Sequence, residues 1–522
     1  MGQLRRGLST RDQLVVGIAG SVGTGVLFST AGMAALAGPG MVLAWFIGAV
    51  MYAFIMLTYV ELAQVYPEAG GPARYSLYTY GPLTNMIASF ANLVWYLFIP
   101  PVEALATVEG INYFWPQLIN THGDPTILGG VLSAVFLLLF VPFNYYGIKG
   151  FARSTNLLGI IKLILYVLAA IGFITVARFT NFTAFHGVVP FGMNGVFIAI
   201  PLGMFAFGGI RVIADYSEEL SSPERLRGTF VRILAGQTIV YLLFGLGFVV
   251  SLNWSNLKLA AGDWGSISSI AGNPFLTIAH ANSIVWLIPL TIVIAILGPF
   301  VTGYIYQGAG SRVLMAMSRS GLMSAKLKEI SQDFAIPAWA LLVMAAIGAV
   351  LAFIFAPVPG IYSLIGDAVV GGYIAFAPNS AVMFALRRNG HTGIIRGGAW
   401  IAAIAFAVIS LIIYWSGWPS VPYAVALMTI GSLVFGVMYK TGSGLRQALW
   451  YIVYIVFLTA MTYVGGVGSL SLFNIDVGSL IVVVVSLVVF LPWAIASRLP
   501  KEAAADMYSK HFVAPQEQSQ AT

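Results

Sequence analysis

The chain has 522 residues, of which 59% are hydrophobic and only 8% are charged, whereas soluble globular proteins carry about 25% charged residues. A chain so poor in charge cannot cover the surface of a soluble fold, and a chain so hydrophobic does not remain disordered. The composition therefore predicts an integral membrane protein. Zero cysteines exclude disulfides, thiolate metal sites and cysteine nucleophiles. The net charge of +7 requires no nucleic acid partner, because cytoplasmic loops of membrane proteins are rich in Lys and Arg.

Apolar runs of about 20 residues, the length that crosses a bilayer, predict an all-α protein with about fourteen transmembrane helices. The runs begin near Gln13, Gly40, Leu83, Ile127, Thr155, Gly195, Thr229, Pro274, Pro337, Pro359, Gly397, Val421, Ala448 and Val477. Residues 83–115 contain Pro100-Pro101 and residues 274–317 are unusually long, so each stretch could hold a helix break instead of an extra span. No polar stretch is long enough for a soluble domain.

The N-terminus also resembles a secretory signal, because Arg5, Arg6 and Arg11 precede an apolar run that ends in residues 35–37 (ALA). The run is too long for the apolar region of a signal peptide, and another span follows it at once. We therefore expect the first helix to be retained.

The basic residues predict the orientation of the chain. With a cytoplasmic N-terminus, nearly all of the 25 Lys and Arg residues fall on the cytoplasmic side. Arg178 and Lys258 fall outside, and Lys162 and Arg211 lie within spans. This asymmetry predicts a multi-pass plasma membrane protein with both termini in the cytoplasm and an even number of spans.

Glycines interrupt two spans, at residues 17–25 (GIAGSVGTG) and 205–210 (FAFGGI). Close packing of helices is the commonest role of such small residues. These two segments, however, lie in the first and sixth spans. If the first ten spans form two sets of five, these are the first span of each set. This pattern is typical of inverted-repeat transporters, whose broken helices meet at the bilayer midplane. Amides freed at a break can bind a carboxylate, and freed carbonyls can bind an ammonium group or a cation.

Charged residues within the spans are costly in lipid and usually face a cavity, a partner or an ion path. They are Glu61, Glu103, Glu109, Lys162, Arg211, Asp215 and Asp367. Arg211 and Asp215 are four residues apart and could neutralise each other. Lys162 has no acidic residue within a turn or two and lies about 10 Å from the end of its span. It could reach the interface by snorkelling, but we favour a buried amine that gains and loses a proton.

Several motifs resemble those of the amino acid–polyamine–organocation (APC) transporter superfamily. They are residues 22–28 (VGTGVLF), 38–40 (GPG), 59–62 (YVEL), 66–72 (YPEAGGP), 205–209 (FAFGG), 218–219 (EE), 223–225 (PER), 311–312 (SR) and 317–321 (MSRSG). The resemblance covers the first ten spans, and the last four carry no motif.

The resemblance implies a LeuT-type fold with a 5+5 inverted repeat, broken helices 1 and 6, and alternating access. The expected divisions are a cytoplasmic N-terminus (1–12), a first repeat (13–177), a second repeat (195–386), four additional helices (397–497) and a cytoplasmic tail (498–522).

The resemblance also implies a substrate site at the two breaks. Amides around Gly23, Thr24 and Gly25 would bind the carboxylate of the substrate. Carbonyls of Ser21, Phe205 and Gly208 would bind its amine, and Phe205 or Phe207 would form an aromatic gate. The full expected set is Ser21, Val22, Gly23, Thr24, Gly25, Phe205, Ala206, Phe207, Gly208 and Gly209.

Lys162 resembles the fifth-helix lysine of proton-coupled members, whose ammonium group lies near the first and eighth helices in place of a sodium ion. Sodium-coupled relatives use paired hydroxyls on the eighth helix, where this chain offers Thr302 alone. The resemblance therefore favours coupling to protons through Lys162.

Arg211 departs from the family pattern, because many relatives carry Asp or Glu just after the sixth-helix break. It could pair with Asp215, Glu103 or Glu109, or attract an anionic group of the substrate. These four residues are our candidates for gating or specificity.

We therefore predict a secondary active transporter of amino acids or related amines, working by proton symport in a lipid membrane. An amino acid exchanger, or a carrier of polyamines, nucleobases or cations, is the alternative. A channel would need a selectivity filter that the sequence lacks, and an enzyme would need a motif such as HExxH or GxSxG. No cofactor, metal or nucleic acid is expected, and the sequence does not specify the oligomeric state.

Overall fold

A computed structural model describes residues 3–270, 272–358, 361–441 and 443–512, which are helical and contain no β-strand. Thirteen segments of this described part are long and apolar enough to cross a membrane. The first, Thr24–Val65, has 42 residues, about twice what one crossing needs, and the 3-10 turn Gly38–Gly40 divides it. It therefore provides two crossings, which brings the number of spans to the fourteen predicted. The protein is an all-α, multi-pass membrane protein.

The first five spans contain two shorter helices and four long ones. They are α1 (Thr10–Ser21) and α2 (Thr24–Ala37), which share the first span, then α3 (Met41–Val65), α5 (Pro82–Ile111), α6 (Ile127–Tyr145) and α7 (Gly147–Ile174), with the short α4 (Tyr75–Tyr80) before α5. A capping box begins α1, because the Ser9 hydroxyl and the Asp12 carboxylate each accept a hydrogen bond from the other residue's amide.

The next five spans also begin with a divided helix. They are α9 (Gly192–Met204) and α10 (Gly209–Asp215), then α11 (Leu226–Ser251), α13 (Leu287–Arg319), α14 (Ala338–Phe355), and α15 (Ile361–Ile374) with α16 (Phe376–Arg388). The short helices α8 (Thr180–Thr183) and α12 (Pro274–Ala281) lie in the loops. The last spans are α17 (Gly398–Ser416), α18 (Ser420–Tyr439), α19 (Leu445–Val464) and α20 (Ile475–Val485) continuing into α21 (Leu491–Ala496), and the tail forms α22 (Lys501–His511).

The two stretches that could hold a helix break, residues 83–115 and 274–317, each contain one long helix. Helix α5 continues through Pro100 and Pro101, so the break considered there does not occur. Pro274 begins the short helix α12, where the Asn273 side chain accepts hydrogen bonds from the first amides. The eighth span therefore begins at Leu287, later than predicted. The predicted start near Pro359 lies outside the described residues.

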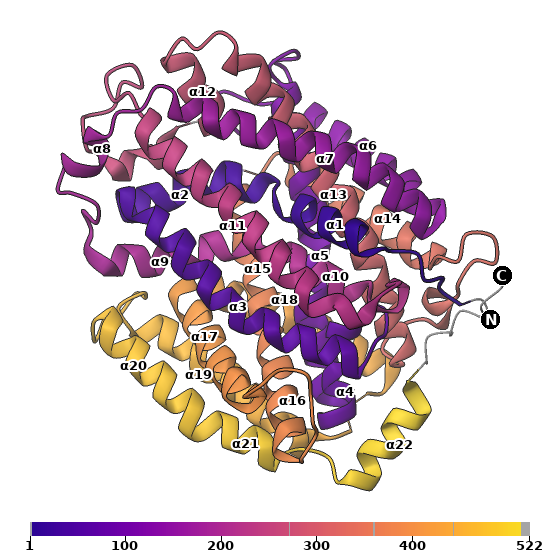
Figure 1. The fold of residues 1–522 in the computed structure, drawn as a ribbon. Helices are drawn as coiled ribbons and strands as arrows, with labels where there is room; N and C mark the ends of the chain where they lie inside the picture. Colours follow the sequence, from indigo (N-terminus) through magenta and orange to yellow (C-terminus); the bar gives the residue numbers. More distant parts are fainter. Residues whose placement is uncertain (1–2, 271, 359–360, 442, 513–522) are drawn as a thin grey trace.

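The helices pack around a central group that contains both divided spans. Helix α13 packs along α5, α14 along α6, and α11 against α3 and α7. Figure 1 shows α17 and α19 to α21 along one side of the molecule, with α6, α7 and α14 on the opposite side. Helix α17 packs against α3, α9 and α16, and thus joins the last helices to the first ten spans.

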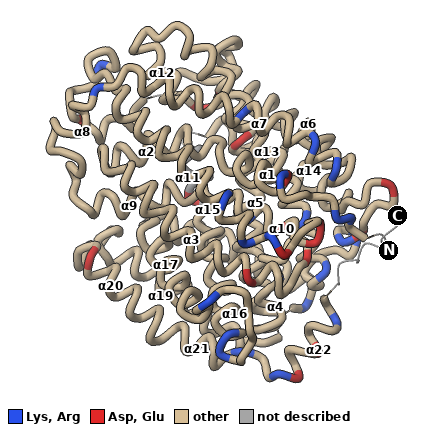
Figure 2. The backbone as a smooth tube through the Cα atoms, viewed as in Figure 1, with Lys and Arg blue, Asp and Glu red and all other residues tan. Residues whose placement is uncertain are grey.

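The two ends of the molecule differ in charge. The segment before α1 and the tail helix α22 lie toward one end, and α8 and α12 lie toward the other (Figure 1). Figure 2 shows most Lys and Arg segments in the half that contains α4, α16 and α22, with a few near α8 and others between the central helices. The uneven distribution follows the pattern predicted for a protein with both termini in the cytoplasm, and the orientation itself stays a prediction.

Candidate functional site

The two divided helices lose regular geometry where the sequence places their glycines. Helix α1 ends at Ser21, and α2 begins at Thr24 after Val22 (φ −82°, ψ 83°) and Gly23 (φ −135°, ψ −136°). In the sixth span, residues Phe205–Gly208 form a 3-10 turn between α9 and α10. The first break is therefore unwound as predicted, whereas the sixth is a tightened turn and not an open segment.

The breaks are joined directly by one side chain. Ser21 Oγ donates a hydrogen bond to Gly17 O at 2.8 Å and accepts one from the Gly209 amide at 3.0 Å. A Cβ atom on Gly209 would collide with both Ser21 and Gly17, and one on Gly25 would lie 3.0 Å from the Phe205 ring. Only glycine allows the two spans to approach this closely.

Glu103 of α5 binds the amide that was predicted for the substrate carboxylate. The Thr24 amide donates to Glu103 Oε2 at 3.2 Å, and the Thr24 hydroxyl donates to the same oxygen. The Gly23 amide donates to Ser21 O at 3.1 Å. The third predicted amide, that of Gly25, lies in the first turn of α2, where backbone amides have no acceptor within the helix. Sequence reasoning found Glu103 but not its partner.

The predicted carbonyl acceptors are also partly used. Of the three, Ser21 O accepts from the Gly23 amide. Next to Phe205, Ala206 O, which was not among the predicted acceptors, accepts a hydrogen bond from the Tyr241 hydroxyl at 2.5 Å. Tyr241, on α11, carries no motif and was missed by sequence reasoning.

Lys162 of α7 lies where the resemblance places it, between the first and eighth spans. Its Nζ donates hydrogen bonds to Ala19 O at 2.7 Å, Gly298 O at 2.7 Å and Thr302 Oγ1 at 2.8 Å. The side chain is fully buried, so it does not snorkel to an interface. Three oxygens from α1 and α13 form a set of acceptors suited to a cation.

The lysine site adjoins the first break. A Cβ atom on Gly23 would collide with the Thr302 side chain and lie 3.1 Å from Glu103 Oε1. Thr302, which binds Lys162, and Glu103, which binds Thr24, therefore both pack against Gly23. Lys162 and the first break are thus connected through Thr302.

A cavity of about 540 Å³ extends from the breaks to the loops after α17 and α19. Thr24, Gly25 and Phe205 line it, and so does Asp367, whose Oδ1 accepts a hydrogen bond from Ser420 at 2.7 Å. Phe207 instead packs into the interior, with its ring centroid 5.6 Å from that of Tyr52. Of the two predicted gates, Phe205 is the one at the cavity.

Glu109 is separate from the breaks. A Cβ atom on Gly272 would lie 3.5 Å from Glu109 Oε1, which places Glu109 beside the loop between α11 and α12. Glu103, by contrast, binds at the first break.

Arg211 lies beneath the cavity, behind an aromatic layer that sequence reasoning missed. The Trp95 ring centroid is 5.9 Å from that of Phe205 and 5.8 Å from that of Tyr373, and the Arg211 guanidinium carbon is 5.0 Å from the Trp95 ring. Asp215 accepts a hydrogen bond from the Tyr96 hydroxyl. The proposed pairing of Arg211 with Asp215, four residues away, is therefore not a hydrogen-bonded ion pair among the described residues.

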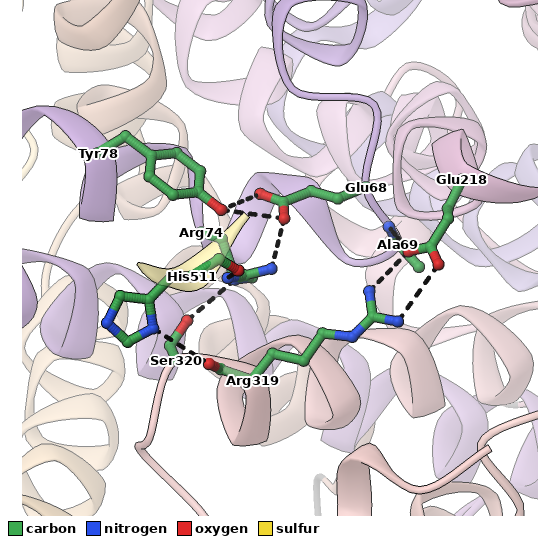
Figure 3. A network of polar contacts seen from close by, with 8 residues as sticks. All are labelled: Glu68, Ala69, Arg74, Tyr78, Glu218, Arg319, Ser320 and His511. Atoms are coloured by element: carbon green, nitrogen blue, oxygen red, sulfur yellow. Dashed lines mark hydrogen bonds and ion pairs between the residues drawn. The ribbon is translucent and has the colours of Figure 1, made fainter. Parts of the chain in front are cut away.

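Buried ion pairs lie among α3, α13, α16 and the segments that follow α3 and α10. We call them the charge cluster: Glu61–Arg387, Glu68–Arg74, Glu218–Arg319 and Glu219–Arg312. Figure 3 shows part of it, with Glu68 receiving hydrogen bonds from Arg74 and Tyr78, and Glu218 receiving them from Arg319 and the Ala69 amide. Glu61 thus has a structural partner, which the sequence did not reveal.

The carboxylates of the charge cluster depend on their arginines. Burial raises the pKa of Glu68 and of Glu219, while Arg74 and Arg312, respectively, oppose this change. The Glu218–Arg319 and Glu219–Arg312 pairs join the segment after α10 to α13. Arg74, which pairs with Glu68 inside the loop after α3, donates a hydrogen bond to Ser320 Oγ at the end of α13 at 3.1 Å. The cavity beside Phe205 lies on the other side of the breaks from these ion pairs.

Comparison with known proteins gives consistent matches. The family model described as "Amino acid permease" matches residues 8–413. The chain is 28% identical to the aspartate-proton symporter of Bacillus subtilis (strain 168), over 96% of this chain and 98% of that protein. It is 27% identical to the glutamate/serine transporter AimA of the same organism, over 97% of this chain and 96% of that protein. It is also 23% identical to the aromatic amino acid transport protein AroP of Escherichia coli (strain K12), over 84% of this chain.

Proposed function

Because the chain belongs to the amino acid permease family, we propose that it carries amino acids across the plasma membrane together with protons, by alternating access. Amino acid transport, rather than catalysis, is the activity of this family and of the matched relatives. One of these relatives is named as a proton symporter. The observation that carries the proposal is the Lys162 site, because a buried amine on three oxygens beside a helix break can link a proton to the geometry of that break.

The substrate binds where α2 begins. Its carboxylate takes the first-turn amides of α2, including that of Gly25, and replaces Glu103 at the Thr24 amide. Its ammonium group faces the 3-10 turn at Phe205–Gly208, and the Phe205 ring covers it from the cavity. Support comes from the cavity wall, which contains Thr24, Gly25 and Phe205, and from the positive end of the helix dipole at the start of α2.

Lys162 couples this site to protons. A protonated Lys162 holds α1 and α13 together through Ala19, Gly298 and Thr302. Loss of the proton leaves a neutral amine, which binds these acceptors less strongly, and α1 is then free to move. Glu103 carries the complementary charge on the other side of Gly23.

Residues 13–177 and 195–386 act as the two repeats that move against each other. With both termini in the cytoplasm, the cavity faces the outside and the charge cluster closes the inside. Opening the inner end requires the cluster to separate, and closing the outer end requires the cavity walls around Phe205 to meet.

Uptake into proteoliposomes tests the coupling. An inward proton gradient is expected to increase amino acid uptake at least about tenfold, and Lys162→Ala is expected to remove this increase but keep exchange of internal for external substrate. Lys258→Ala, which removes an exposed loop lysine, is the matched control and is expected to respond as the unmodified protein does.

Two results would count against the proposal. A Lys162→Ala protein that still responds to the gradient would exclude the coupling role of this lysine. Uptake by the unmodified protein that depends on internal substrate and ignores the gradient would show an exchanger, which is the alternative function.

A further inference from the structure

Arg211 is a buried cation without a hydrogen-bonding partner. Its side chain is fully buried, and none of Nε, Nη1 and Nη2 has an acceptor among the described residues. A guanidinium group presents five N–H donors in a plane. A buried charge of this kind is strongly unfavourable unless it is paired and hydrogen-bonded, so this arginine calls for an acceptor.

The protein surrounds the guanidinium with aromatic rings. Its central carbon lies 5.0 Å from the Trp95 ring, 5.3 Å from the Tyr96 ring and 5.2 Å from the Phe376 ring. Rings attract a cation through their faces, but they supply no acceptor for the N–H groups. Asp215 lowers the local positive charge; its Oδ2 accepts a hydrogen bond from Tyr96, and its Oδ1 has no hydrogen-bond partner among the described residues. The donors of Arg211 are therefore not used by Asp215 in this structure.

The position of Arg211 connects it to the substrate site. It follows Gly208 by three residues, a rise of about 4.5 Å along a helix, which a short acidic side chain can span. A Cβ atom on Gly372 would lie 2.9 Å from Arg211 Nη1, and one on Gly208 would collide with Trp95 and Tyr306. Trp95 thus packs against Arg211 and also against the cavity residues Phe205 and Tyr373.

We propose that Arg211 binds the side-chain carboxylate of the substrate and makes the transporter selective for acidic amino acids. This inference rests on the proposed function. When the α-carboxylate is held at the start of α2, a turn of the Trp95 ring opens the way from the cavity to Arg211. A carboxylate then accepts two parallel hydrogen bonds from the guanidinium group. A neutral side chain leaves the buried cation unpaired, and sites built in this way reject substrates that lack the matching group.

Ligand binding to the purified full-length protein tests the inference, by thermal shift and by displacement of a radiolabelled amino acid. The unmodified protein is expected to bind aspartate or glutamate at least about 100-fold more tightly than the matching amide, asparagine or glutamine. Arg211→Gln is expected to reduce acid binding about 100-fold and to leave amide binding unchanged or stronger. The matched control is Arg388→Gln, because Arg388 also lies over a ring, that of Phe384, but is exposed.

The comparison of acid with amide in the unmodified protein does not depend on whether Arg211→Gln folds. Equal binding of aspartate and asparagine, and of glutamate and glutamine, would overturn the inference, as would an Arg211→Gln protein that keeps the preference. Gradient-driven uptake of neutral amino acids without any acid preference would reject this inference alone. An acid preference in a protein that ignores the proton gradient would reject only the coupling.

Discussion

Gly23 stands between the two polar side chains on which the proposed mechanism depends. A methyl group on this residue would collide with Thr302 and lie 3.1 Å from Glu103 Oε1. Gly23→Ala is therefore expected to separate α13 from the first break and to lower uptake at least about tenfold. Uptake in proteoliposomes at equal protein content measures this effect.

Gly228→Ala is the matched control, because a Cβ atom there would meet nothing within 4 Å. It is expected to transport at the unmodified rate. Normal uptake by Gly23→Ala would show that the space beside Thr302 does not matter for transport.

At the scale of residues, the sequence reveals a charge more readily than its partner. Lys162 could be predicted because a lone amine in an apolar run is visible without a structure. The contacts of Glu103 with Thr24 and of Arg211 with Trp95 could not, because they join spans that are far apart in the sequence. Gly23 was visible as part of a break, but its packing against Thr302 was not.

The tail helix α22 is an element whose docking responds to pH. The Arg74 side chain donates a hydrogen bond to His511 O at 2.6 Å, and the Tyr508 ring packs on Tyr66 and Tyr78. Burial lowers the pKa of His511, the Arg319 carbonyl opposes this, and nearby Arg74, Lys510 and Lys328 lower it further. As the pH falls, His511 in the undocked tail therefore takes up a proton at a higher pH than His511 in the docked tail.

Protonation of His511 therefore weakens the docking of α22. Docking is fully favourable above about pH 6.5, the usual pKa of histidine, and weakens as the pH falls below it. Hydrogen exchange of α22, corrected for the intrinsic rate, is expected to be faster at about pH 5.5 than at about pH 7.5. His511→Gln should remove this difference and His391→Gln, at an exposed position, should keep it. An unchanged difference in His511→Gln would reject the role of the histidine.

At the scale of elements, helix type and number followed from apolar length, whereas the form of the breaks did not. Glycines at 205–210 predicted an open segment, but backbone contacts and the Tyr241 hydroxyl hold Phe205–Gly208 in a 3-10 turn. The later start of the eighth span at Leu287 was also hidden, because α12 is apolar and reads as part of the same run.

In the whole molecule, the cavity lies on one side of the breaks and the charge cluster lies on the other. Removing the charge of Glu219 leaves Arg312 buried without its partner, which costs about 3–5 kcal/mol. Glu219→Gln is therefore expected to destabilise the closed inner end and to shift the population away from the state with the open cavity.

The lack of native cysteine makes this shift measurable with a single introduced thiol. Ser29 lines the cavity, and a Ser29→Cys protein is expected to react with maleimide at least about fivefold more slowly when it also carries Glu219→Gln. Glu224→Gln breaks an exposed ion pair and should leave the rate unchanged. Equal rates in the two double variants would show that the charge cluster does not set the population.

The cavity wall extends into a part of the chain beyond the family match. Trp415, Trp418, Gly466 and Ile475 line the cavity, whereas the match ends at residue 413. The lysine contacts and both breaks lie entirely before that point. One part of the cavity wall is therefore encoded apart from the lysine contacts and the breaks, so that substitutions after residue 413 can reshape this wall without touching the residues proposed to couple transport to protons.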